Sequence, residues 1–159
     1  MSRLPLFALA LFVLVPADSA LAAWQYKTST DPFTDIRSHA ATLVVKDGKN
    51  SHALVVRCNA GTLESVVDLG KALGKKPVAV RWRIDKADPV QEQWPPSADG
   101  KSVLAPDAAA FARLMARGQT LAFEATSNRN VTYLVRGSLA GSAEAIRRVF
   151  TACGLPATE

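Results

Sequence analysis

The most regular pattern in the chain is the alternation of apolar and mostly charged residues between positions 78 and 85. Successive side chains of an extended segment point to opposite faces, so one face of this segment is apolar and the other polar. The apolar set is Val78, Val80, Trp82 and Ile84, and the opposite set is Ala79, Arg81, Arg83 and Asp85. This pattern predicts a half-buried antiparallel strand.

Shorter stretches repeat the alternation and predict a chain rich in strands. They cover residues 52–58, 63–69, 120–126 and 131–136, with an earlier pair at 24–28 and 36–45. Segments 47–50 and 127–130 contain residues that tolerate tight turns, and each separates two apolar runs, so each is expected to close a hairpin. The Pro-rich, polar stretch 87–100 is expected to form a surface loop.

Two segments have helical spacing instead. In 107–117, Asp107 is placed to cap the first turn, and Gly118 follows where a left-handed helix stop is expected. Ser142 is the expected N-cap of a second helix over 142–152. The apolar stripes are Phe111, Leu114 and Met115 in the first helix, and Ile146, Val149, Phe150 and Cys153 in the second.

Together these elements predict a mostly β, α+β fold. Two arrangements satisfy the pattern: a curved antiparallel β-sheet with the two short helices packed on one side, and a β-sandwich edged by the helices. The sequence does not decide between them.

The N-terminal segment has the organisation of a secretory signal peptide. A single cation, Arg3, precedes an apolar run over 6–15 that is too short to span a bilayer, which needs roughly 20 apolar residues. Small residues then fit a cleavage before Ala23, and a cleavage one residue later, before Trp24, fits nearly as well. We expect a signal peptide at 1–22 and one secreted β-rich domain at 23–159. We also expect a periplasmic or secreted location, with no stable membrane span after cleavage.

The two cysteines, Cys58 and Cys153, have neither a C-x-x-C spacing nor nearby histidines at metal-ligand spacing. Each falls on the apolar face of its predicted element, so both point into one core, and an oxidising compartment favours their pairing. A disulfide closing so long a loop would stabilise the fold by about 4 to 5 kcal/mol. The alternative is a pair of buried free thiols.

Charge and motifs narrow the classes of function. The formal net charge is +5, which favours acidic partners, and an exported protein rarely meets nucleic acid. We find no catalytic, metal-binding or cofactor-binding motif, and we expect His39 and His52 to be exposed strand residues. The sequence therefore predicts no catalytic residues, no metal and no cofactor.

The candidate ligand-binding residues are cations on the face opposite the core. Arg57, Arg81, Arg83 and Arg136 all alternate outward, so neighbouring strands would form a cationic stripe able to bind an anionic ligand. The alternative is an ordinary solvated face on which the arginines pair with Asp85 or Glu124. Trp94 is a further candidate, because exposed tryptophan is enriched at binding surfaces, but it could equally fold back over the sheet.

Several short strings also occur in an order that resembles the exported, type VI secretion-associated proteins called VasI or TagO. These are Trp24, the string at 30–35, Val56-Arg57-Cys58, the string at 81–85, the string at 94–99 and the late Cys153. The resemblance implies a periplasmic accessory role without catalytic residues. Asp85, Ser97 and Asp99 lie in these strings and join the candidate partner-binding residues.

Three classes of function follow from these patterns. The first is an exported accessory or binding protein that recognises an envelope or secretion-system protein or an anionic ligand. The second is a secreted structural or envelope-stress domain, and the third is a hydrolase of envelope components. The absence of a catalytic motif favours the first two.

Overall fold

The computed structural model describes residues 23–157, and the predicted signal peptide lies outside them. Nine strands in this part of the chain form two antiparallel sheets. Sheet A has the order β1 (Gln25–Thr30), β2 (Arg37–Asp47), β3 (Asn50–Asn59), β4 (Thr62–Asp68) and β7 (Ser102–Leu104). Sheet B has the order β6 (Val90–Trp94), β5 (Val78–Ile84), β8 (Thr120–Thr126) and β9 (Thr132–Ser138). The helices are α1 (Ala108–Arg117) and α2 (Ser142–Ala152).

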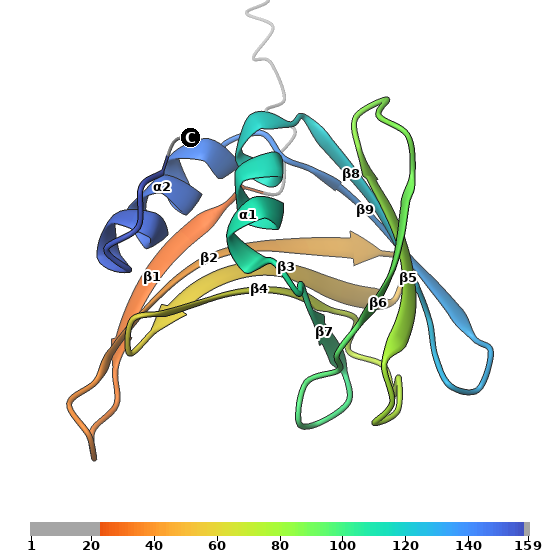
Figure 1. The fold of residues 1–159 in the computed structure, drawn as a ribbon, viewed down its shortest axis with the longest axis horizontal. Coiled ribbons are helices and arrows are strands. Elements are labelled where there is room, and N and C mark those ends of the chain that lie inside the picture. The colour runs from red at the N-terminus through yellow and green to blue at the C-terminus, as the bar shows by residue number, and fades with distance from the viewer. Residues whose placement is uncertain (1–22, 158–159) are drawn as a thin grey trace, which may run out of the picture.

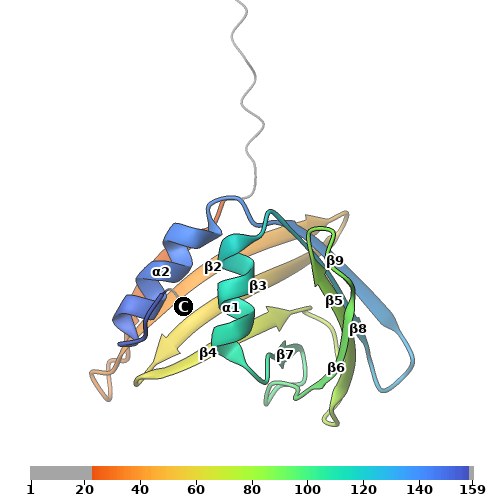
Figure 2. The same cartoon turned by 45° about the horizontal axis from the view of Figure 1, so that its top comes forward.

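Both helices lie against the concave side of sheet A (Figure 1). Helix α2 packs on β1, β2 and β3, and α1 packs on β4 and on α2. Sheet B stands beside α1 at the other end of the molecule, a placement that the tilted view also shows (Figure 2). The predicted mostly β fold with two short packed helices is confirmed. The helices cover the curved sheet A, and the second antiparallel sheet, sheet B, gives the molecule the two sheets of a β-sandwich-like fold.

The core of sheet A follows directly from the alternation of its strands. The antiparallel register places Leu43, Leu54, Val67 and Val103 in one row across four strands, and all four are fully buried. Adjacent rows extend this apolar face beneath the helices. Burial of each such side chain stabilises the fold by roughly 1.5 to 3 kcal/mol, so these rows hold the sheet against α1 and α2.

A disulfide joins Cys58 to Cys153, as predicted. Cys58 is on the inner face of β3, and Cys153 follows α2 directly. Their Cα atoms are 5.6 Å apart, and their separation along the sequence is 95 positions. The bond therefore fixes the C-terminal helix to the centre of sheet A.

The predicted surface loop at 87–100 is wrong in its centre. Residues 90–94 form β6, which pairs with β5, and Pro96 bridges to Val103 beyond it. The sequence did not reveal this strand because it lies at a sheet edge and only Trp94 in it is buried. A single buried position gives no alternation.

Two predicted helix ends also differ. Gly118 does not adopt a left-handed conformation, since its φ is −87° and its ψ is 171°. A Cβ at this position would lie 2.2 Å from Ile84 Cγ2, so glycine is required by close packing. Ser142 is the first residue of α2, and its hydroxyl donates to the carbonyl of Met115 at 2.8 Å, which links the two helices.

The expected exposure of His52 is wrong as well. Its side chain is only 4% exposed, and Nδ1 lies 3.1 Å from the carbonyl oxygen of Leu69. His52 shares the inner face of β3 with Leu54, so its burial follows from the same alternation that buries its neighbours.

Candidate anion-binding surface

The outer face of sheet B carries the charged half of the alternating pattern. Pairing of β5, β8 and β9 places Arg83, Ala122 and Arg136 in one row across three strands. The row above it contains Arg81, Glu124 and Leu134. We call the depression over these two rows the cationic hollow; its lining also includes Pro89.

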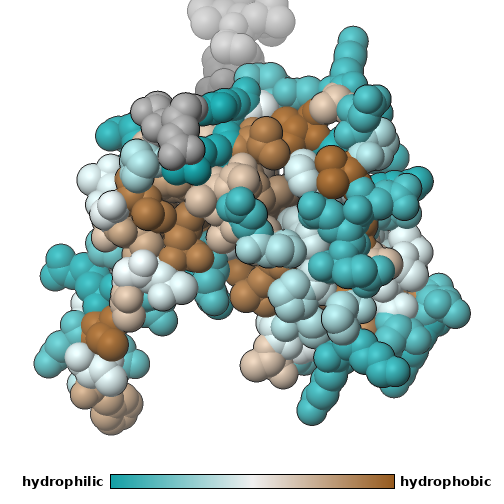
Figure 3. Space-filling view, viewed as in Figure 1, coloured by the Kyte–Doolittle hydropathy of each residue, from teal (hydrophilic) through white to brown (hydrophobic). Residues whose placement is uncertain are grey.

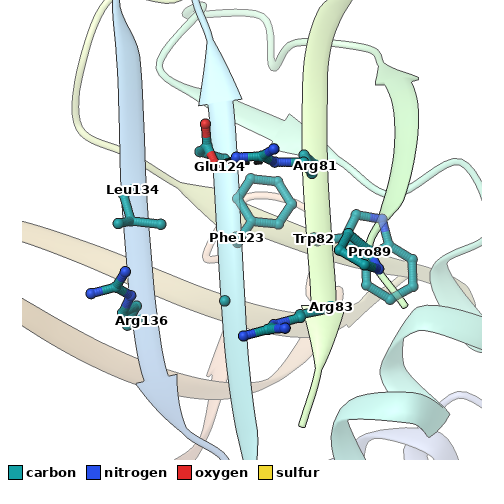
Figure 4. A pocket seen from close by; sticks show the side chains of 9 residues that line it. Arg81, Trp82, Arg83, Pro89, Phe123, Glu124, Leu134 and Arg136 are labelled. Carbon is teal, nitrogen blue, oxygen red and sulfur yellow. Dashed lines mark hydrogen bonds and ion pairs between the residues drawn. The ribbon is translucent and has the colours of Figure 1, made fainter. Parts of the chain in front are cut away.

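The cationic hollow owes its shape to a small residue between two long ones. Ala122 has only a methyl group, so the space between Arg83 and Arg136 is not filled by the strand that separates them. Arg83 extends from β5 toward β8, and Leu134 lies beside Arg136 on β9 (Figure 4). The row of Arg83 and Arg136 is thus cationic at both ends and apolar at Ala122, and the row above it also contains the carboxylate of Glu124, which is paired with Arg81.

The arginines of the hollow differ in their partners. Arg81 is paired with Glu124, whose Oε2 accepts from both Nε and Nη2 of the guanidinium. Among residues 23–157, no carboxylate lies within ion-pair distance of Arg83 or Arg136. Two guanidinium groups that share one row are therefore available for an external carboxylate or phosphate, which they can bind in bidentate fashion.

Asp85 does not neutralise this pair, although it follows Arg83 closely in sequence. Its carboxylate accepts from the backbone amides of Thr120 and Gln119, at 2.8 Å and 3.0 Å. These amides, with that of Thr120 contributing most, hold the pKa of Asp85 below its usual range. Asp85 thus fixes the start of β8, and its expected role as a partner-binding residue stays a prediction.

Arg57 does not join the stripe, because it lies on β3 of sheet A. Its Nε donates to Glu64 Oε2 at 2.6 Å on the neighbouring strand. The expectation of one stripe of four arginines is therefore wrong. The sequence could not assign these strands to different sheets, since each alternates in the same way.

The three candidates between 94 and 99 have structural roles. Trp94 is only 1% exposed, and its ring packs against Phe111 and Phe123 at centroid distances of 5.0 and 5.2 Å. The hydroxyl of Ser97 donates to Asp99 at 2.6 Å and accepts from the amide of Ser102 at 3.0 Å. These contacts build a turn. Of the two alternatives for Trp94, the structure shows burial.

The sequence did not single out Ala122 and Leu134 as part of the site. Both occupy outward positions of their strands, and Leu134 is 40% exposed. An outward apolar residue that alternates with Arg136 is a detectable signal, but only once the pairing of β8 and β9 is known.

No group of three or more His, Cys, Asp or Glu side chains among the described residues is arranged to hold a metal ion. Within residues 23–157, neither helix has the length and hydropathy needed to cross a bilayer.

Comparison with known proteins identifies the fold but not the family. No family model matches the sequence, and no curated protein matches it. Among solved structures, the chain is similar to invasion associated protein B from Bartonella henselae, with a TM-score of 0.59 at 13% sequence identity. The match covers 83% of this chain and 94% of that chain. At this identity the similarity establishes a shared fold.

Proposed function

We propose that this chain is an exported, non-catalytic binding protein of the bacterial envelope that recognises an acidic segment of a protein partner. The observation that carries the proposal is the arginine row of sheet B, where Arg83 and Arg136 flank Ala122 without a carboxylate partner among the described residues. An apolar floor with two cationic sides suits a carboxylate next to an apolar side chain.

Export is supported by the N-terminal apolar run and by the disulfide, which persists in oxidising compartments. The ordered strings shared with VasI or TagO favour a secretion-system component as the partner. A non-catalytic role is supported by the lining of the cationic hollow, which includes neither histidine. His39 Nδ1 lies 2.7 Å from the hydroxyl of Tyr26, and His52 Nδ1 contacts the carbonyl of Leu69.

The test is affinity capture from envelope extracts, with the disulfide-bonded chain as bait. Wild type is compared with the double variant Arg83→Ser/Arg136→Ser and with Lys75→Ser/Lys76→Ser, which removes the same charge from the exposed segment before β5. A captured protein is then purified and titrated against each bait. We expect the arginine variant to bind more than about tenfold more weakly, because both charge-assisted contacts are lost.

The lysine variant is expected to bind like wild type. Equal binding by all three baits would contradict a role for the cationic hollow. If capture yields no specific partner but loss of the chain weakens the envelope, the structural, envelope-stress alternative gains support.

A further inference from the structure

A second feature of the surface is a single aromatic side chain at the end of the hairpin between β1 and β2. Phe33 is 93% exposed. The hairpin projects away from both helices at the lower left of the ribbon view, and its end carries hydrophobic surface (Figures 1 and 3). Ile36 in the same turn is 39% exposed, so the turn presents two apolar side chains that contribute nothing to the core.

The turn that holds Phe33 is ordered by its own hydrogen bonds. Oδ1 of Asp31 accepts from the amides of Phe33 and Thr34 at 2.8 and 2.9 Å, and the amide of Asp31 donates to the carbonyl of Ile36 at 2.9 Å. The two amides lower the pKa of Asp31, with that of Phe33 contributing most. A rigid presentation of this kind reduces the entropy lost on binding.

The turn is also acidic within a basic protein. Residues 31–36 contain Asp31 and Asp35 and no cation, whereas the whole chain has a net charge of +5. A bilayer with anionic lipids would repel two carboxylates at the point of insertion. A protein surface with an apolar floor and cationic sides would accept both the ring and the carboxylates.

The cationic hollow of the same chain has this chemistry. Its floor contains Ala122 and the half-exposed Leu134, and its sides carry Arg83 and Arg136. Arginine guanidinium groups bind carboxylates and also stack on aromatic rings. The turn and sheet B, whose outer face carries the hollow, lie at opposite ends of the molecule (Figure 1), so the turn of one copy cannot reach the hollow of the same copy.

We propose that the acidic turn at 31–36 of one copy docks into the cationic hollow of a second copy, with Phe33 over Ala122 and Leu134 and with Asp31 and Asp35 facing Arg83 and Arg136. This inference rests on the proposed function, because the same arginines receive the carboxylates. The contact joins two different surfaces, so each docked pair retains one unused turn and one unused hollow. Association is therefore head-to-tail and continues with concentration.

Two variants separate the two halves of the contact. The turn variant is Asp31→Asn/Phe33→Ser/Asp35→Asn. Asparagine keeps the Oδ1 acceptor at 31 and tolerates the φ of 55° at 35, so the hairpin is retained. The hollow variant is Arg83→Ser/Arg136→Ser. The controls are Val131→Ser, which removes another half-exposed apolar side chain from a hairpin turn, and Lys75→Ser/Lys76→Ser.

The measurement is sedimentation equilibrium of the disulfide-bonded chain up to about 1 mM, because small interfaces give weak complexes. We expect the average mass of wild type to rise with concentration and to fall back in high salt. Each variant alone remains monomeric. An equimolar mixture forms dimers, because the intact turn of the hollow variant docks into the intact hollow of the turn variant. These dimers grow no further, since the remaining turn and the remaining hollow are the substituted ones. Both controls associate like wild type.

Monomeric wild type over the whole range would overturn self-docking, as would a mixture that stays monomeric while wild type associates. Self-docking would also be overturned if wild type stays monomeric and the turn variant no longer captures the envelope partner. The turn would then bind another protein. These results are distinct from failure of the proposed function, which is seen as equal envelope capture by the wild-type and hollow-variant baits.

Discussion

The two sheets carry similar alternating sequences but use their polar faces differently. On sheet A, Arg57 is neutralised by Glu64, and the opposite face is covered by both helices and fixed by the disulfide. On sheet B, Arg81 is neutralised in the same way, but the next row has arginines at both ends and only Ala122 between them. The comparison separates residues that stabilise the fold from residues that remain available for binding.

The largest expected effect on stability concerns the disulfide of sheet A. Replacing both Cys58 and Cys153 with serine should lower the free energy of unfolding by about 4 to 5 kcal/mol, because the closed loop restricts the unfolded chain. Urea denaturation of the variant and the oxidised wild type measures this difference. A loss below about 1 kcal/mol would show that helix packing alone holds α2 on the sheet.

The core of sheet B should respond nearly as strongly. Trp94→Ala removes a fully buried ring that packs against Phe111 and Phe123, and it also removes the indole N–H that donates to Glu92 at 2.6 Å. We expect a loss of about 3 to 5 kcal/mol in the free energy of unfolding. Leu134→Ala, at the exposed floor of the hollow, is the control and should cost less than about 1 kcal/mol.

A smaller effect should appear in the pH dependence of stability. Backbone amides lower the pKa of folded Asp85, so its carboxylate contributes stability above the unfolded pKa of about 3.9. That contribution is lost as the pH falls from there through the folded pKa. The melting temperature should therefore decline below about pH 4, and Asp85→Asn should make the decline shallower.

Asp88→Asn provides the control for this titration, because Asp88 is exposed and lies near Asp85 on the same connection between β5 and β6. Its profile should follow that of wild type. Identical acid profiles for all three proteins would contradict the role of Asp85 in fixing the start of β8.

Much of the fold could be predicted because alternation and helical spacing are local properties. The strand over 78–84, both helices and the inward direction of Cys58 and Cys153 all follow from spacing within a few residues. Strand β6 could not be found in this way, because its polar residues lie at a sheet edge and only Trp94 contacts the core. Trp94 itself is held by Phe111 and Phe123, which are distant in sequence.

The candidate site shows the same limit more clearly. The sequence identified outward arginines correctly, but whether they are neutralised depends on which strands pair and in which register. Arg57 and Arg81 each face a glutamate on the adjacent strand, whereas Arg83 faces Ala122. Only the three-dimensional pairing distinguishes a neutralised arginine from an available one.

The smallest expected effect on stability belongs to the two available arginines, and it is the sharpest test of the comparison. Arg83→Ser/Arg136→Ser breaks no ion pair between the described residues and removes two like charges from one row. We therefore expect the free energy of unfolding to change by no more than about 0.5 kcal/mol. At low salt the change should favour the variant, because the repulsion between the two arginines is then least screened in wild type. Arg57→Ser is the matched substitution on sheet A, where it leaves Glu64 without its partner and costs up to about 1 kcal/mol. If urea denaturation shows that the sheet B variant is the less stable of the two, the arginine row is part of the fold. Its availability for a carboxylate, on which both proposals depend, would then be lost.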